Sequence, residues 1–347
     1  MAASIEDVAA RAGVSVATVS RALRGLPNVA PTTRGRVLEA AQVLDYVTNP
    51  TASRLAVGRT FTIGMVVPLF TQWFFTQVVA GAEAVLATAG YDVLLYNVSG
   101  ADGRRRFLDR MPFRKRVDGI IVVDLPLAED ERVTLAGLGT PVVTVGLVTG
   151  HFPSVSIDNV AAATTATRHL VNLGHERLAL ISGVPDDPLR FTAPVDRRTG
   201  WRQVLVEKGL DTPMELDVPG HFSLAGGAEA MGQLLALDDP PTGVFAESDE
   251  MAIGAMKAAR ELGARVPGDV SIVGFDDHDV AEFFGLTTVA QPVRQQGAVA
   301  AEMLLKALAA GAADTPDRVV LPTRLRVRST TGSVRPSRRE RDLAARA

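Results

Sequence analysis

The sequence predicts a small all-α helix-turn-helix domain, followed by an α/β core of two doubly wound lobes with parallel sheets. Residues 4–23 form two short helical patterns around a glycine, and from Thr60 onward apolar strand-like runs alternate with helical segments. At 347 residues, the chain is also too long for one ordinary domain.

The first two helices have recognisable ends. Ser4 and Asp7 are spaced like a capping box, Gly13 suits a left-handed helix end, and Ser15 can cap the second helix. Apolar residues recur at helical spacing through both helices: Ile5, Val8, Ala9, Ala12, Val16, Val19, Ala22 and Leu23. A glycine turn between two short helices is typical of the motif whose second helix enters a DNA major groove.

A third helix is expected from Pro31, which suits a first helical position, to about Leu44. Ala30 gives it a weak cap. Its predicted core face is Val37, Leu38, Ala41 and Leu44, and the head should pack around Val8, Val19, Leu23, Val37 and Leu38. This head spans residues 1–47. Residues 48–59 follow as a hinge, which is too short to be a stable helix without DNA and a partner hinge.

Residues 60–332 contain the strand–helix alternation. The apolar runs include FTIGMVV, YDVLLYNV, DGIIVVDL, TPVVTVG, LALISG, PTGVFAES and VSIVGFDD. Two parallel lobes with a cleft at the carboxyl ends of their strands suit a small ligand. Residues 333–347 are rich in charge and contain proline, so we expect a disordered tail.

Composition excludes several classes of protein. No apolar run is long enough for a membrane span, and the start does not resemble a signal peptide, so a cytoplasmic protein is expected. Cysteine is absent, which excludes disulfides and thiol catalysis. Residues 1–60 have seven arginines against four acidic residues, whereas the rest of the chain has a net charge of −6. A basic head on an acidic body fits a head that meets phosphate.

Motifs for catalysis are missing. The sequence has no GxSxG, no GxxxxGK[ST] and no GxGxxG after a strand, and the five histidines do not pair at metal-ligand spacing. We therefore expect no enzyme activity, no cofactor and no metal. The basic run from Gly103 to Gly119 is interpreted as a solvated helix face.

The segment DVAARAGVSVATVSRAL resembles the N-terminal signature of the LacI/GalR family of bacterial transcription repressors. The resemblance continues through Asn28-Val29, TRGRVLEAA and LDYVTNPTASRLA. It implies a type I periplasmic-binding-protein-like core in which the chain crosses between lobes near Asp158, Gln291 and Leu321. The N-lobe would contain residues 60–158 and 292–320, and the C-lobe residues 159–290 and 321–332. The tail lacks leucine heptads, so a homodimer is favoured.

By this resemblance, Val16, Ala17 and Arg21 would read bases, with Arg21 able to donate two hydrogen bonds to guanine. Other family positions contact the DNA backbone or belong to the hinge: Ser15, Thr18, Ser20, Asn28, Thr33, Asn49 and Ala56. Leu55 matches the leucine that wedges into the minor groove. The alternative for Leu55 is packing on the core.

The resemblance also implies effector-binding residues at the cleft: Trp73, Phe74, Phe75, Asp124, Arg197, Phe222, Ser248 and Asp276. At least one of the three adjacent aromatics is expected to be a core residue, and Asp276 could instead cap a helix. Arg198 is expected to be an exposed helix-start arginine. Aromatic faces, a guanidinium and a carboxylate together suit a neutral sugar better than a purine.

The favoured hypothesis is a ligand-responsive, sequence-specific transcriptional regulator. It would repress carbohydrate genes by binding double-stranded operator DNA as a dimer, and a mono- or oligosaccharide effector would change its affinity. Two alternatives are a solute-binding receptor with the same two-lobed core and an enzyme on a doubly wound fold. The head argues against the first, and the lack of catalytic motifs argues against the second.

Overall fold

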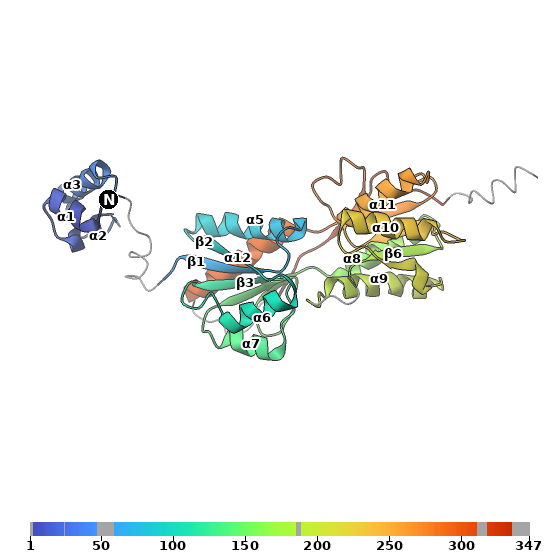
Figure 1. The fold of residues 1–347 in the computed structure, drawn as a ribbon, viewed down its shortest axis with the longest axis horizontal. Coiled ribbons are helices and arrows are strands. Elements are labelled where there is room, and N and C mark those ends of the chain that lie inside the picture. The colour runs from blue at the N-terminus through green and yellow to red at the C-terminus, as the bar shows by residue number, and fades with distance from the viewer. Residues whose placement is uncertain (1–2, 24, 47–58, 185–188, 311–317, 335–347) are drawn as a thin grey trace, which may run out of the picture. The chain divides into compact units, whose positions relative to one another are not determined.

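The computed structural model describes residues 3–23, 25–46, 59–184, 189–310 and 318–334 (Figure 1). The chain divides into two compact units: a helical head before Thr62 and a larger core that contains most residues from Thr62 onward. Each unit is described by itself.

The head contains α1 (Ile5–Ala12), α2 (Val16–Leu23) and α3 (Pro31–Val43). The predicted capping box is present, since the Asp7 N–H donates to Ser4 Oγ at 3.2 Å and the Ser4 N–H donates to Asp7 Oδ2 at 2.8 Å. Gly13 ends α1 with a φ of 65°, a conformation that glycine adopts without steric cost. No side chain caps α3 at Ala30.

Val8, Val19 and Val37 are fully buried at the centre of the head. The prediction that Leu38 belongs to this core was wrong, because its exposed fraction is 50%. The buried residues of α3 are Val37, Ala40 and Ala41, which share one helical face. Leu38 follows Val37 by one residue, a rotation of about 100° around the helix, and therefore points to solvent.

The core contains two six-stranded sheets. The first has the order β11-β5-β4-β3-β1-β2 and is parallel throughout. Its strands are β1 (Thr62–Val67), β2 (Asp92–Asn97), β3 (Gly119–Val123), β4 (Val142–Val145), β5 (Ser154–Ser156) and β11 (Arg318–Val320).

The second sheet has the order β12-β10-β9-β8-β6-β7. Its strands are β6 (Leu178–Ser182), β7 (Asp217–Pro219), β8 (Gly243–Ala246), β9 (Ser271–Asp276), β10 (Thr287–Ala290) and β12 (Arg324–Arg326). Strand β12 pairs antiparallel with β10, which departs from the expected fully parallel lobe. Five strands of three or four residues were not predicted from the sequence: β5, β7, β10, β11 and β12.

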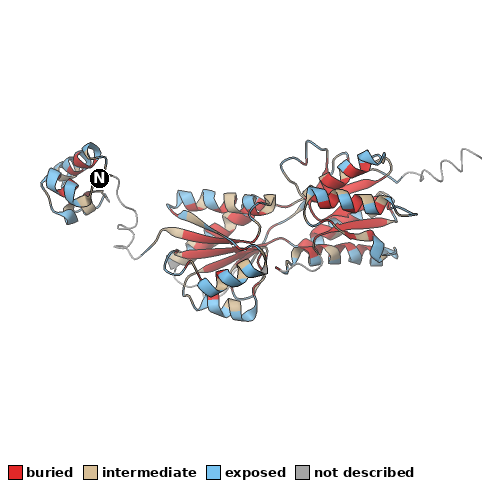
Figure 2. Cartoon of the chain, viewed as in Figure 1, coloured by how far each residue is buried: buried red, intermediate tan, exposed pale blue. Residues whose placement is uncertain are grey.

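Helices cover both faces of each sheet (Figure 1). The first lobe has α5 (Trp73–Thr88), α6 (Gly100–Arg110), α7 (Glu129–Ala136) and α12 (Val293–Ala310). The second has α8 (Asn159–Asn172), α9 (Ala193–Lys208), the 3₁₀ helix η1 (Met214–Leu216), α10 (Leu224–Leu235) and α11 (Asp249–Glu261). The central strands are buried between these layers (Figure 2). No helix in the described ranges is long and apolar enough to cross a membrane.

The chain passes between the lobes three times. It leaves the first sheet after β5 and enters α8, returns between β10 and α12, and passes again between β11 and β12. Each lobe is therefore built from separate stretches of chain. The carboxyl ends of both sheets border the region between the lobes, where parallel α/β folds bind ligands.

Helices α5 and α12 pack so closely that glycine is required at their contact. A Cβ on Gly81 would lie 1.9 Å from the Arg294 carbonyl oxygen, and one on Gly297 would lie 2.0 Å from that of Val78. We expect Gly297→Ala to lower the free energy of unfolding by about 2 kcal/mol or more, as overpacking does. The control is Gly232→Ala in α10, where no atom lies within 4 Å of the added Cβ. Because alanine favours a helix more than glycine does, this variant should gain up to about 1 kcal/mol of stability. Urea unfolding of both variants tests this, and equal effects would contradict it.

Candidate functional site

The exposed side of α2 carries the residues expected to read bases. Val16, Ala17 and Arg21 are exposed on this short helix. The Thr18 N–H donates to Ser15 Oγ at 3.3 Å, so Ser15 caps the helix as predicted. Ser20 and Thr33 are partly buried and Asn28 is exposed. Asn49, Leu55 and Ala56 lie outside the described residues, so their DNA contacts stay predictions.

A cavity lies between the two lobes of the core. Side chains from both sheets and their adjoining helices line it: Gln72, Phe74, Phe75, Asp124, Ile157, Asn159, Phe191, Pro194, Arg197, Phe222, Ser248, Glu250, Asp276, Gln291 and Gln296. Seven of the eight predicted effector residues are in this lining, and Trp73 is not. Glu250, Phe191 and the glutamines are lining residues that the sequence analysis missed, because only the folded chain brings them to the cavity.

Arg197 is fixed on the second-lobe side of the cavity. Its side chain is buried, Nε donates to Asn159 Oδ1 at 3.0 Å, and Nη1 donates to the Glu247 carbonyl at 2.5 Å. Its guanidinium carbon lies 3.7 Å from the ring centre of Phe275, a cation–π contact. These contacts hold the guanidinium plane while its remaining N–H groups stay available to a ligand.

Arg198, which was expected to be exposed, is instead half-buried. Its Nε lies 2.7 Å from Asp217 Oδ2, and its Nη2 donates to Ser182 Oγ at 3.0 Å. The two adjacent arginines of α9 therefore have different surroundings, one at the cavity and one in an ion pair at the start of β7.

Of the three carboxyl groups in the cavity lining, Asp276 and Glu250 have raised pKa values. Asp276 ends β9 with a φ of 116° and accepts a hydrogen bond from Gln291 Nε2 at 2.6 Å. Loss of water contact raises the pKa of Asp276 to about 6, although Arg197 and Gln291 oppose the shift. For Glu250, burial and then repulsion from Asp276 raise the pKa to about 7, and a hydrogen bond from the Trp73 backbone N–H opposes this.

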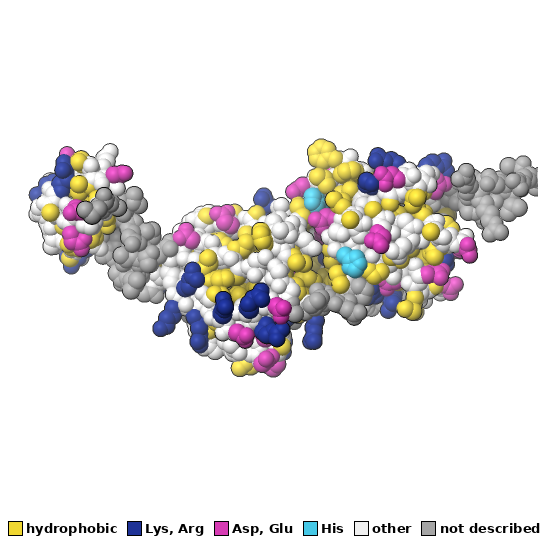
Figure 3. Space-filling model, viewed as in Figure 1, with side chains coloured by type: hydrophobic (Ala, Val, Ile, Leu, Met, Phe, Trp, Pro, Cys, Tyr) yellow, Lys and Arg dark blue, Asp and Glu magenta, His cyan; other side chains and the backbone are white. Residues whose placement is uncertain are grey.

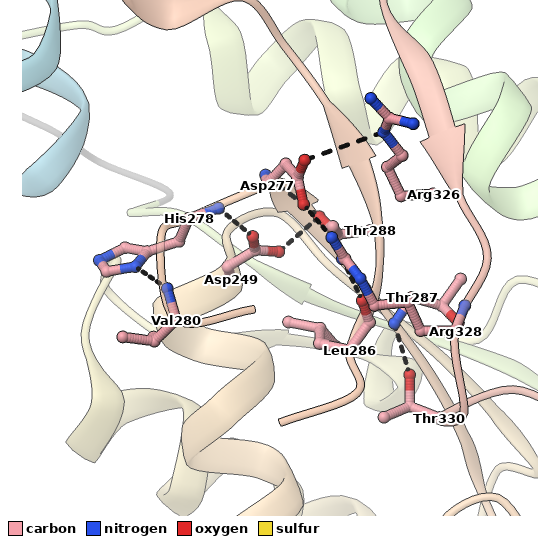
Figure 4. Close-up of polar contacts among 10 residues, drawn as sticks. All are labelled: Asp249, Asp277, His278, Val280, Leu286, Thr287, Thr288, Arg326, Arg328 and Thr330. Atoms are coloured by element: carbon pink, nitrogen blue, oxygen red, sulfur yellow. Dashed lines mark hydrogen bonds and ion pairs between the residues drawn. The ribbon is translucent and has the colours of Figure 1, made fainter. Parts of the chain in front are cut away.

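A polar network that includes Asp249, Asp277 and Arg328 holds the turn that follows β9 (Figure 4). The buried carboxyl of Asp249 accepts hydrogen bonds from Thr288 Oγ1 at 2.5 Å and from the His278 N–H at 2.7 Å. Asp277 Oδ1 lies 2.7 Å from Arg328 Nη2. The turn is thus fastened to α11, to β10 and to the segment after β12, which fixes Asp276 at the edge of the cavity.

The positions of three other lining residues, Phe222, Ser248 and Asp124, are set by the backbone around them. Phe222 has a φ of 49°, and its ring lies against Gly183, where a Cβ would be only 2.5 Å from the ring. Ser248 Oγ accepts from the Met251 N–H at 3.2 Å and so caps α11 while lining the cavity. Asp124 has a φ of 44° and lies against Gly146, where a Cβ would be 2.8 Å from its Oδ1.

Trp73 connects the lobes instead of lining the cavity. Its Nε1 donates to Asp279 Oδ2 at 3.0 Å, and its rings stack on His278 with 4.8 Å between centroids. Trp73 begins α5 in the first lobe, whereas His278 and Asp279 follow β9 in the second. The two residues after Trp73 both line the cavity, where Phe75 is buried and Phe74 is partly exposed.

The first part of the arginine-rich run lies on α6 of the first lobe, and Arg114, Lys115 and Arg116 follow in the turn after this helix, where basic side chains gather at the surface (Figure 3). Arg105 and Arg106 are exposed, and Arg105 lies 2.7 Å from Asp102 of the same helix. Arg104 pairs with Glu131 of α7 at 2.5 Å. The interpretation as a solvated helix face therefore holds for Arg105 and Arg106 but not for the whole run, because Arg104 is mostly buried in its ion pair and residues 114–116 lie beyond the helix.

Comparison with known proteins supports the same two-part reading. Residues 4–49 match the model for bacterial regulatory proteins of the lacI family, and residues 167–331 match a periplasmic binding protein-like domain. Catabolite control protein A of Priestia megaterium is 35% identical over 335 residues, which covers 95% of this chain and all of that protein. The chain belongs to the LacI family of bacterial transcriptional regulators. As a LacI-family protein it is a ligand-responsive DNA-binding regulator, and its helix-turn-helix head and two-lobed core agree with the prediction.

Solved structures of LacI-family members share the fold. The lac repressor dimer bound to operator and the anti-inducer ONPF superposes with a TM-score of 0.84 at 28% identity, covering 96% of this chain and 100% of that one. The complex of the transcriptional regulator CelR with cellobiose gives a TM-score of 0.69 at 32% identity, covering 94% and 99%. The expected type I periplasmic-binding-protein-like fold is thus confirmed.

The raised pKa of Glu250 makes stability depend on pH. A carboxyl whose pKa rises from 4.5 to about 7 on folding binds its proton more tightly in the folded state. Its stabilising contribution is therefore complete below pH 4.5 and is lost as pH rises to about 7. We expect Glu250→Gln to gain stability relative to the parent between pH 5 and pH 7.5 in urea unfolding. The exposed-site control Glu229→Gln should show no such gain.

Proposed function

We propose that this protein represses carbohydrate uptake or catabolism genes by binding a pseudopalindromic operator as a homodimer, and that a sugar in the interlobe cavity changes its affinity for DNA. The observation that carries the proposal is the composition of the cavity in a chain with a DNA-binding head: four phenylalanine rings, an anchored arginine, carboxyl groups and amides.

A sugar uses each of these groups. Its ring has apolar faces that stack on phenyl rings such as Phe74 and Phe222. Its hydroxyls both donate and accept, so they can donate to Asp276 and accept from the free N–H groups of Arg197. Among the solved relatives, CelR was determined with cellobiose, which is consistent with a carbohydrate in a cavity of this family.

The dimer proposal is based on apolar side chains at the surface of the second lobe. Phe283 is 89% exposed, and Leu224, Leu262 and Phe284 are also exposed. Leu224 and Phe284 line one surface groove together with Ile253 and Met256 of α11. Large exposed apolar patches commonly mark protein interfaces, and a two-fold pairing here would present two heads to a two-fold symmetric DNA site.

The regulatory step would use the connection between the lobes. A ligand shifts a conformational equilibrium only through different affinities for the two states. A sugar that touches Phe74 and Asp124 from the first lobe and Arg197 and Asp276 from the second depends on their relative position. Its binding would therefore favour one lobe arrangement and alter the linker that leads from the core to the head. Since chromosomal DNA is the proposed partner, the protein would act in the cytoplasm, by binding and not by catalysis.

The DNA part is tested by selecting bound duplexes from genomic DNA and titrating the recovered site by fluorescence anisotropy. We expect a two-fold symmetric site that binds one dimer. Arg21→Gln should weaken binding to it by about 1–3 kcal/mol through loss of a guanine contact. The control Arg11→Gln, at an exposed position of α1, should weaken DNA binding only through the loss of one positive charge. It should leave the preference for the operator sequence unchanged. Failure to enrich any symmetric site at low salt would contradict the proposal.

The effector part is tested with neutral sugars, including cellobiose and ribose, by isothermal titration and by their effect on operator binding. One sugar should bind and shift the DNA affinity at least tenfold, or about 1.4 kcal/mol. Arg197→Lys should bind that sugar at least tenfold more weakly, because an ammonium cannot keep both the Asn159 and Glu247 bonds while facing a ligand. Arg202→Lys, an exposed change on the same helix, should bind normally. If both variants bind the sugar equally well, Arg197 is not a ligand-binding residue.

A further inference from the structure

We propose that the cavity selects an effector without anionic groups, and that Glu250 is the residue that enforces this selection by excluding phosphorylated and acidic sugars. The inference rests on the sugar-binding function proposed above and narrows its ligand class. Two observations support it: the charged side chains that line the cavity, and the protein groups that already accept hydrogen bonds from helix N-termini beside the cavity.

Acidic groups outnumber basic groups in the cavity. Asp124, Glu250 and Asp276 all line it, whereas Arg197 is the single basic side chain among the described lining residues. Like charges repel strongly where water is partly excluded. A phosphate or carboxylate placed here would therefore meet the carboxyl groups of Glu250 and Asp276, with Arg197 as the one cation among the lining residues that the structure describes.

That cation is already partly engaged by the protein. Arg197 donates to Asn159 and to the Glu247 carbonyl and stacks on Phe275, which draws its charge toward the wall of the second lobe. It also lies close enough to Asp276 to lower the pKa of that carboxyl. The guanidinium can still donate to a hydroxyl, but it cannot neutralise Asp276 and a ligand anion equally well.

Helix N-termini could otherwise attract an anion, because their free N–H groups carry partial positive charge. Helices α5, α8, α9 and α11 all begin at or beside lining residues. Helix α9 has Pro194 in its first turn, which lacks an N–H, and no side chain caps it at Thr192. At each of the other three ends, one backbone N–H already has an acceptor. The Trp73 N–H at the start of α5 donates to Glu250, the Met251 N–H of α11 donates to Ser248 Oγ, and the Ala161 N–H of α8 donates to Asp158 Oδ1. Glu250 thus takes the position at α5 that a ligand phosphate would need, and it does so from the opposite lobe.

The same arrangement favours neutral polyols. Hydroxyl groups can donate to carboxylates without bringing charge, and the phenyl rings accept the apolar face of the sugar ring. Gln291 donates to Asp276 and accepts from Gln296, so this part of the lining is also ordered by neutral amides. A neutral sugar therefore satisfies the lining without adding a charge to it.

The test compares matched ligands on the full-length protein at pH 8, above the pKa values of both Glu250 and Asp276. Each neutral sugar of the panel is titrated calorimetrically beside its 6-phosphate and its uronic acid, for example glucose, glucose 6-phosphate and glucuronate. For the sugar that binds, the anionic partners should bind at least tenfold more weakly. Glu250→Gln should reduce this ratio at least threefold by improving anion binding, and Glu250→Asp should preserve it.

Glu229→Gln is the matched control, since it removes one exposed negative charge from α10 of the same lobe. It should leave the ratio unchanged. Wild-type binding of a phosphorylated or acidic sugar as tight as its neutral parent would overturn the inference, and so would an unchanged ratio in folded Glu250→Gln.

Operator titrations on the same samples separate this inference from the proposed function. An anionic sugar that binds tightly and shifts DNA affinity would uphold regulation by a sugar and overturn the charge selection. A neutral sugar that binds selectively without altering DNA affinity would uphold the selection and overturn the regulatory role. Absence of binding by the entire panel would overturn the sugar assignment and this inference with it.

Discussion

The buried guanidinium of Arg197 is the interaction on which the candidate site depends. The side chain comes from α9 and donates hydrogen bonds to Asn159 at the start of α8 and to the backbone carbonyl of Glu247, which follows β8. It also stacks on Phe275 of β9. A buried charge is stable only when it is paired and hydrogen-bonded, so these four segments must keep their relative positions. The contacts of Arg197 thus join these segments in the cavity wall of the second lobe.

Close to Arg197 lie carboxyl groups whose ionised form is destabilised by burial. Burial raises the pKa of Asp276, and burial together with repulsion from Asp276 raises the pKa values of Glu250 and of the buried Asp249. Strained backbone at Asp124, Phe222 and Asp276 occurs at the same cavity. Strained backbone and shifted pKa values both cost stability, and they concentrate at functional sites in proteins.

Trp73 shows how the two lobes communicate. Its indole bonds Asp279 and stacks on His278, and its backbone N–H bonds Glu250. One residue of the first lobe thus contacts the segment that follows Asp276 and a lining carboxylate of the second lobe. Trp73 therefore connects the first lobe both to the turn after β9 and to the cavity wall of the second lobe.

The sequence by itself determined the local elements: the capping box at Ser4, the glycine turn at Gly13 and the long strands, because these depend on neighbouring residues. Family resemblance then supplied seven of the eight predicted residues that line the cavity. Only the tertiary structure decided that Trp73 joins the lobes, that Leu38 faces solvent and that Glu250 completes the wall. These outcomes depend on helix rotation and on contacts between distant residues, such as Trp73 and Asp279 at a separation of 206 positions, which no local pattern records.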